Sequence, residues 1–300
     1  MLEDVPRSLG PKVVPVGGPP LPIGQRLELP GRGTTFVRRL EGPAGAPTLL
    51  LLHGWMASGG LNWYRAFDTL GQHFNVIAVD MRGHGRGIRN ARRFRLADCA
   101  DDAAATLDAL DVESVIAVGY SLGGPVAQLL WKRHREKVDG LVLCSTAHRL
   151  MPGVREAWVF ATMMAVAAGT TRLGQIATKV PVKRVQSMLP VASSKRPSTI
   201  QAWARGEMRR HSSRMVMEAG VAMSNYNAKW IKKVDVPTAC LITTKDRAIP
   251  ALAQAQMALA IPDATVHRLE DGHLACAKVS FAPHLLRACQ DVAGRVTPRA

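Results

Sequence analysis

The chain has 300 residues, of which 47% are hydrophobic and 21% charged, a composition typical of a globular protein with a sizeable core. Five cysteines without a C-x-x-C pair argue against a disulfide framework, and the longest apolar helical stretch, residues 157–169, is too short to span a bilayer. No apolar signal segment opens the sequence, so we expect a cytoplasmic location. The net charge of +16 favours an anionic partner.

The predicted elements begin with a Pro/Gly-rich arm, residues 1–24, that we expect to lack a core of its own. Two stretches around a Gly-Arg-Gly turn, residues 26–30 and 34–40, predict a hairpin. Apolar runs then predict strands at residues 47–53, 75–80, 114–119, 140–145, 238–244 and 264–270. Helical patterns lie between them at residues 62–70, 94–110, 122–131, 250–260 and about 280–293. This alternation predicts an α/β fold with a mainly parallel, doubly wound sheet.

One segment, residues 148–233, interrupts the alternation because it contains no convincing strand. It holds eight of the twelve methionines, and its fifteen Lys and Arg against three acidic residues supply +12 of the net charge. We predict that it forms a helical lid inserted into an α/β core made of residues 25–147 and 234–300. Ordinary helical packing of the methionines and a solvated basic face are the alternatives.

A glycine-flanked serine follows the strand predicted at residues 114–119. The turn reads Gly119-Tyr120-Ser121-Leu122-Gly123, the pattern G-x-S-x-G. A serine at such a strand-to-helix turn takes a strained backbone, and its neighbours at −2 and +2 must be small, as Gly119 and Gly123 are. The following helix N-terminus also favours negative charge near Ser121. The pattern indicates a nucleophile, with a plain glycine-rich turn as the alternative.

A nucleophilic serine needs a base, and the base needs an orienting acid, in the chain order serine, acid, histidine for this type of turn. Three of the nine histidines come late enough in the chain: His267, His273 and His284. His267 lies within a predicted strand and His284 within the last predicted helix. His273 lies in the loop after the last strand, where parallel sheets carry their active loops, so we predict it as the base.

Asp246 is the predicted acid because it directly follows the strand at residues 238–244. A surface ion pair of Asp246 with Lys245 or Arg247 is the alternative. Asp263, in a turn, and Asp271, beside the histidine, are poorer candidates.

Two backbone N–H groups are needed to hold the charge that develops on the attacked oxygen. We expect one from Leu122, the residue after the serine, and the other from Trp55, in the loop after an early strand. Met56 is the neighbouring alternative to Trp55. His53, at the end of that strand, is expected to be a buried structural residue.

Together these motifs resemble the α/β-hydrolase family. LHGW, VDMRGHG, GYSLGG, TTKD and DGH occur in that family's order, and the resemblance covers nearly everything after residue 25. It implies the α/β-hydrolase fold, and the serine nucleophile resembles the branch that cleaves esters, thioesters and lipids. Two departures stand out. Arg86-Gly87-Ile88-Arg89 replaces the small residue usual after the R-G-H-G turn, and Thr243-Thr244 replaces a glycine near the acid.

We therefore expect a serine hydrolase of carboxylic esters or thioesters, with lipid-like acyl chains, that acts through an acyl-enzyme without metal or cofactor. The methionine-rich lid suits flexible acyl chains, and its charge suggests an anionic headgroup, a coenzyme A thioester or an anionic membrane surface. The alternatives are a carbon–carbon bond hydrolase or acyltransferase with the same triad, and a low-turnover ligand- or membrane-binding protein. Nucleic-acid binding is not expected, because aromatic residues are only 5% of the chain.

Overall fold

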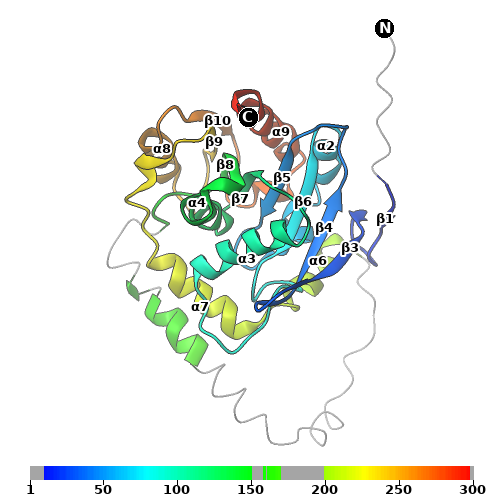
Figure 1. Cartoon of the computed structure of the whole chain (residues 1–300). Helices are drawn as coiled ribbons and strands as arrows, with labels where there is room; N and C mark the ends of the chain where they lie inside the picture. Colours follow the sequence, from blue (N-terminus) through cyan, green and yellow to red (C-terminus); the bar gives the residue numbers. More distant parts are fainter. Residues whose placement is uncertain (1–9, 151–157, 160, 170–198, 298–300) are drawn as a thin grey trace, which may run out of the picture.

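Eight strands form the central sheet of the computed structural model, which describes residues 10–150, 158–159, 161–169 and 199–297 (Figure 1). They are β3 (Gly24–Leu29), β4 (Gly33–Leu40), β5 (Thr48–Leu52), β6 (Asn75–Asp80), β7 (Val115–Tyr120), β8 (Val138–Cys144), β9 (Thr238–Thr243) and β10 (Thr265–Leu269). Their order across the sheet is β10-β9-β8-β7-β5-β6-β4-β3. Neighbours from β10 to β6 are parallel, while β4 and β3 form the predicted hairpin at one antiparallel edge. The prediction of a mainly parallel sheet is confirmed.

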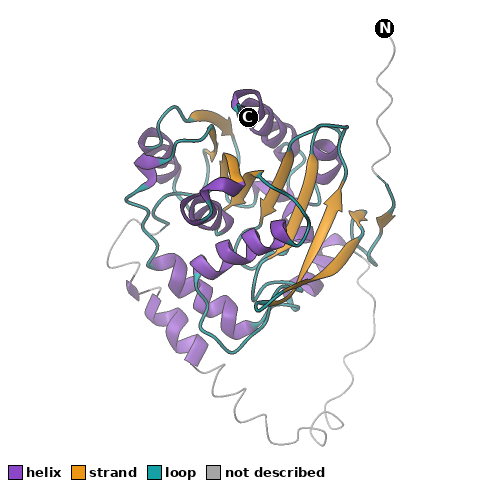
Figure 2. Cartoon of the chain, viewed as in Figure 1, coloured by secondary structure: helices purple, strands orange, loops and turns teal. Residues whose placement is uncertain are grey.

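Helices cover both faces of this sheet (Figure 2). One face packs against α3 (Leu96–Asp108), α4 (Gly123–Arg133) and α8 (Ala251–Ala260). The other packs against α1 (Gly59–Trp63), α2 (Phe67–Gly71) and α9 (Phe281–Arg295). The central strands are apolar on both sides because each face is covered, which explains why four consecutive leucines of β5, Leu49, Leu50, Leu51 and Leu52, are each 0% exposed.

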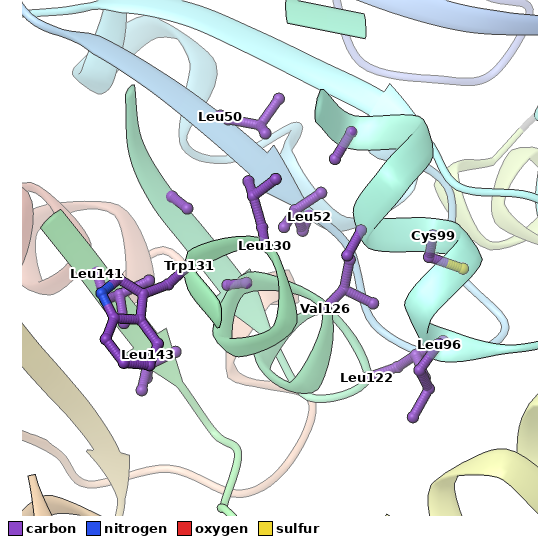
Figure 3. Packing of buried hydrophobic residues seen from close by; sticks show 14 of the residues in the cluster. Leu50, Leu52, Leu96, Cys99, Leu122, Val126, Leu130, Trp131, Leu141 and Leu143 are labelled. Carbon is purple, nitrogen blue, oxygen red and sulfur yellow. The ribbon is translucent and has the colours of Figure 1, made fainter. Parts of the chain in front are cut away.

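Figure 3 shows the core on the first of these faces. Leucines of β5 and β8 point toward α4, and α3 lies beside α4. The cluster buries long aliphatic side chains from every one of these elements, at roughly 25 cal/mol per Å² of apolar surface removed from water. The labelled members are Leu50, Leu52, Leu96, Cys99, Leu122, Val126, Leu130, Trp131, Leu141 and Leu143. This packing supports both elements that flank the turn between β7 and α4.

One local expectation is wrong. The single helix predicted at residues 62–70 is two short helices, and the first starts earlier than predicted because the Ser58 hydroxyl accepts a hydrogen bond from the Leu61 N–H (3.1 Å). The described part of the arm packs against the core of the main sheet. It pairs β1 (Lys12–Val13) with β2 (Leu21–Pro22) and buries Leu21 to 1% exposure.

The described residues between β8 and β9 are mainly helical. They include helical residues at 158–159 and 161–169, then α6 (Ile200–Met208) and α7 (Ser213–Ser224). Seven of the fifteen basic residues of the predicted lid lie outside the described residues, so its extent over residues 148–233 stays a prediction. Across the described ranges, no helix combines the length and the apolar character that a bilayer crossing requires.

Candidate active site

Ser121 occupies the turn between β7 and α4 in a left-handed backbone conformation, with φ +51°. Non-glycine residues rarely adopt such angles unless the surrounding structure holds them there. Here the Ser121 N–H donates to the Cys144 carbonyl oxygen (3.0 Å). The Ser121 carbonyl oxygen accepts from the Gly124 N–H (2.9 Å) and the Thr146 hydroxyl (2.8 Å). Three hydrogen bonds therefore fix the strained turn, as the motif predicts.

The glycines around Ser121 are required by close backbone approach. A Cβ on Gly123 would lie 2.0 Å from the Leu52 carbonyl oxygen, and one on Gly119 would lie 2.4 Å from the Gly123 carbonyl oxygen. On Gly124, which lies just outside the G-x-S-x-G pattern, a Cβ would lie 2.2 Å from the Thr146 hydroxyl. The helix can therefore pass this close to β5 and β7 only where side chains are absent.

The structure brings the three predicted residues Ser121, His273 and Asp246 into one hydrogen-bonded chain. Ser121 Oγ lies 2.9 Å from His273 Nε2, and His273 Nδ1 lies 2.8 Å from Asp246 Oδ2. They follow β7, β10 and β9, so all three lie at the carboxyl ends of parallel strands. With the imidazole proton on Nδ1 and donated to the carboxylate, the Nε2 lone pair faces the serine hydroxyl. In this tautomer the imidazole can accept the hydroxyl proton.

The Asp246 carboxylate is completely buried and accepts several hydrogen bonds besides that of His273. Their donors are the N–H groups of Ala248 and Ile249 (2.9 Å each), the Thr243 hydroxyl (2.8 Å) and the Gln254 amide (3.2 Å). Burial alone would raise the pKa of Asp246, but the hydrogen bonds from His273, Ile249 and Thr243 outweigh it and lower the pKa below its ordinary value. The carboxylate is therefore held as an anion. Its neighbour Lys245 pairs instead with Glu270.

Several positioning residues are not evident from the sequence. Thr243 donates to Asp246 and accepts a hydrogen bond from the Gln254 amide (3.0 Å). The Tyr120 hydroxyl donates to the His273 carbonyl oxygen (2.6 Å) and so anchors the loop that carries the histidine. Burial raises the pKa of Tyr120, which keeps its hydroxyl protonated as a donor. Tyr120 fills a variable position of G-x-S-x-G, so no motif marks it.

The other candidate histidines have partners elsewhere. His267 Nε2 lies 2.8 Å from an Asp291 carboxylate oxygen, and His284 Nδ1 lies 2.8 Å from the Ser280 carbonyl oxygen. His53 is 0% exposed, as expected for a structural residue. Its Nε2 accepts from the Met81 N–H (2.9 Å), and burial lowers the pKa of His53 well below its ordinary value.

The loop that carries Trp55 lies directly beside Ser121. A Cβ on Gly54 would lie 3.5 Å from Ser121 Cβ. The Gly54 N–H donates to Asn62 Oδ1 (2.9 Å), and the Gly54 carbonyl oxygen lies 2.8 Å from His53 Nδ1. The Trp55 indole donates to the Val216 carbonyl oxygen of α7 (2.8 Å). These contacts hold the backbone of the loop in place next to the serine.

Ser121 and His273 line a cavity of about 840 Å³. Its described walls come from the core and from α6 and α7, and they are chiefly apolar: Leu61, Tyr64, Leu150, Ile200, Trp203, Ala204, Met208, Met223, Ile249 and Leu274. Arg65 is the single Lys or Arg among the described lining residues. In the described ranges, no group of three or more His, Cys, Asp or Glu is arranged to hold a metal ion. The site can therefore accept a largely apolar molecule next to a serine with a base.

The sequence agrees with this geometry. Residues 47–277 match the family model described as the alpha/beta hydrolase fold. The chain belongs to the α/β-hydrolase fold family.

Its relatives include proteins of different stated roles. The chain is 28% identical over 245 residues to the magnesium-chelatase 30 kDa subunit of Rhodobacter capsulatus. The aligned region covers 78% of this chain and 82% of that protein. The chain is also 27% identical over 223 residues to the pimeloyl-[acyl-carrier protein] methyl ester esterase of Chromobacterium violaceum, covering 74% and 84%. Among solved structures, the enol-lactonase from Burkholderia xenovorans LB400 shares the fold, with a TM-score of 0.70 and 22% identity over 90% of this chain and all of that one.

Proposed function

We propose that this protein is a serine hydrolase that cleaves carboxylic esters or thioesters whose acyl part is apolar. The observation that carries the proposal is the chain from Ser121 Oγ through His273 to the buried Asp246 carboxylate, at 2.9 and 2.8 Å. A base within hydrogen-bond reach of the nucleophile and an acid behind the base are what a serine nucleophile requires.

The reaction follows from these positions. His273 Nε2 takes the Ser121 hydroxyl proton as Oγ attacks the carbonyl carbon, while the Asp246 carboxylate accepts the hydrogen bond from Nδ1–H and stabilises the imidazolium. The N–H groups of Leu122 and Trp55 hold the oxygen that becomes negative. Collapse breaks the ester bond, and His273 returns the proton to the leaving alcohol or thiol. Water then attacks the acyl-serine with the same base and releases the acid.

Two observations favour an ester with an apolar acyl part. The cavity beside Ser121 is lined chiefly by aliphatic and aromatic side chains. The relatives named above include a methyl ester esterase and an enol-lactonase. The predicted net +12 of residues 148–233 and Arg65 at the cavity favour a substrate that also carries a negative charge.

A second candidate is a binding subunit with little turnover. The relative with the name of a magnesium-chelatase subunit matches 78% of this chain, which favours it. The intact hydrogen-bonded chain through His273 favours the hydrolase. A protein that only binds a ligand needs neither a base beside its serine nor the strained backbone at that serine.

Hydrolysis of p-nitrophenyl esters from acetyl to palmitoyl, measured for the wild type beside Ser121→Ala, tests the proposal. We expect turnover by the wild type and a loss of at least 10³-fold in the variant. No wild-type turnover across the series, from protein shown by circular dichroism to be folded, would favour the binding subunit. Faster transfer of the acyl group to an added alcohol than to water would indicate an acyltransferase.

A further inference from the structure

A partly buried ion pair joins α6 to the loop after β6, outside the hydrogen-bonded chain of Ser121. The Arg86 guanidinium binds the Glu207 carboxylate through two contacts, Nη1 to Oε2 (3.0 Å) and Nη2 to Oε1 (3.1 Å). Glu207 is 6% exposed, and the Ser58 hydroxyl also donates to it (3.3 Å). Two parallel contacts of this kind fix direction as well as distance.

The loop that carries Arg86 is itself rigid. The Arg86 N–H donates to a carboxylate oxygen of the buried Asp80 (2.8 Å), and the other Asp80 oxygen accepts from the Gly59 N–H (2.8 Å). Gly85, with φ +50°, packs so closely that a Cβ would lie 2.3 Å from the Asp80 carboxylate. The guanidinium also lies 5.0 Å from the centre of the Phe36 ring. These contacts therefore fix the position of Arg86 against the core.

Glu207 belongs to the helix that forms one wall of the cavity. Ile200, Ala204 and Met208 of α6 line the cavity, and Glu207 directly precedes Met208 in this helix. The opposite end of α6 packs through Trp203 on Tyr64, with ring centres 5.8 Å apart. The Glu207 carboxylate thus anchors this wall to the core through Arg86 and Ser58, and Arg210, just after the helix, also binds it (3.1 Å).

Resting on the proposed function, we propose that the Arg86–Glu207 pair determines acyl-chain selectivity by holding α6 across the cavity. Short acyl groups react beside Ser121 without reaching α6, whereas long ones pack against Ile200 and Met208. Arg86 is the residue that stands where the resemblance expects a small one, and a small residue could not reach Glu207. Both members are positioning residues, because neither lines the cavity.

The test uses the full chain and two nearly isosteric changes, Glu207→Gln and Arg86→Met, with their double variant. We expect kcat/KM for decanoyl and longer p-nitrophenyl esters to fall at least tenfold in each single variant, mainly through KM. Acetyl ester turnover should stay within twofold of the wild type. The double variant should lose little more than either single one, because both remove the same interaction. Arg209→Ala is the matched control, since it removes an exposed charge at the end of the same helix.

An unchanged chain-length profile in Glu207→Gln would overturn the proposal, as would an equal loss for acetyl and long esters. Hydrogen exchange of backbone amides gives a readout that does not depend on turnover. Glu207→Gln should speed exchange in α6 at least tenfold and leave α8 unchanged. If no ester is cleaved yet α6 loosens, the proposed function fails and the anchoring of the wall stands. If α6 exchange does not change, the anchoring fails on its own.

Discussion

At the scale of single residues, the chemistry depends on which nitrogen of His273 carries the proton. The buried Asp246 carboxylate accepts from Nδ1, and this leaves the Nε2 lone pair 2.9 Å from Ser121 Oγ. The lowered pKa of Asp246 keeps it anionic near neutral pH, since its other hydrogen bonds outweigh the effect of burial.

Asp246→Asn should therefore lower kcat by about 10³- to 10⁴-fold with little change in structure, because an amide can donate to Nδ1 and reverse the tautomer. Initial rates on an acetyl ester check this, and the thermal unfolding midpoint confirms that the variant is folded. A loss below tenfold would show that Asp246 does not set the tautomer.

Thr243 supports the same carboxylate one step further away. Thr243→Val removes a donor to Asp246 and the acceptor of the Gln254 amide while keeping the shape of the side chain. We expect kcat to fall about three- to tenfold and the free energy of unfolding to fall by about 1–3 kcal/mol. Thr244→Val, at an exposed neighbour, should change neither. Equal effects of the two substitutions in kinetics and urea unfolding would contradict the role given to Thr243.

At the scale of elements, the junction of β7 and α4 shows why the site needs small residues. Gly123 begins α4 against the β5 backbone, so its lack of a side chain lets helix, turn and strand meet. The strained φ of Ser121 is tolerated because both elements are buried in the sheet core.

Gly123→Ala should destabilise the protein by about 3 kcal/mol or more, because its Cβ meets a backbone oxygen that cannot move aside. Gly206→Ala, inside α6 with no atom within 4 Å of the new Cβ, should be neutral or stabilise by up to about 1 kcal/mol. Urea unfolding of both variants compares them. Similar midpoints for the two would show that the close approach at Gly123 is not a constraint.

At the scale of the whole molecule, three neighbouring histidines connect the loop before Trp55 with the segment between α6 and α7. His84 lies between His53 and His211, with ring centres 5.4 Å from each. Burial lowers the pKa of all three, that of His84 to about 4. The folded protein thus binds fewer protons at these sites than the unfolded chain, whose histidines titrate near 6.5.

Stability from these histidines is present above pH 6.5 and is lost as the pH falls toward 4. His84 alone contributes about 3 kcal/mol over that window. Burial raises the pKa of Asp80, so this carboxyl changes the stability in the opposite direction, but it is one group against three histidines. Urea unfolding at pH 7, 6, 5 and 4 should show a falling free energy of unfolding. A flat profile would contradict neutral burial of the three rings.

Most of the sheet could be predicted from the sequence, because strands covered on both faces are unbroken apolar runs and the serine turn needs its glycines. The chain order of motifs also identified Ser121, Asp246 and His273, which the structure brings together. What could not be predicted depends on contacts distant in sequence. Tyr120 reaches a carbonyl oxygen 153 positions away, and Arg86 reaches Glu207 121 positions away. No local pattern encodes such pairs.

The central claim is that Ser121 is a nucleophile activated by His273, and covalent labelling with a fluorophosphonate tests it most directly. Attack by Ser121 Oγ on phosphorus would expel fluoride and leave a stable adduct, whatever the natural ester is. Intact-mass spectrometry followed by peptide mapping should find one adduct on Ser121 in the wild type, none in Ser121→Ala, and strongly slowed labelling in His273→Ala. A folded wild-type protein that forms no adduct, or forms it on another residue, would contradict the account.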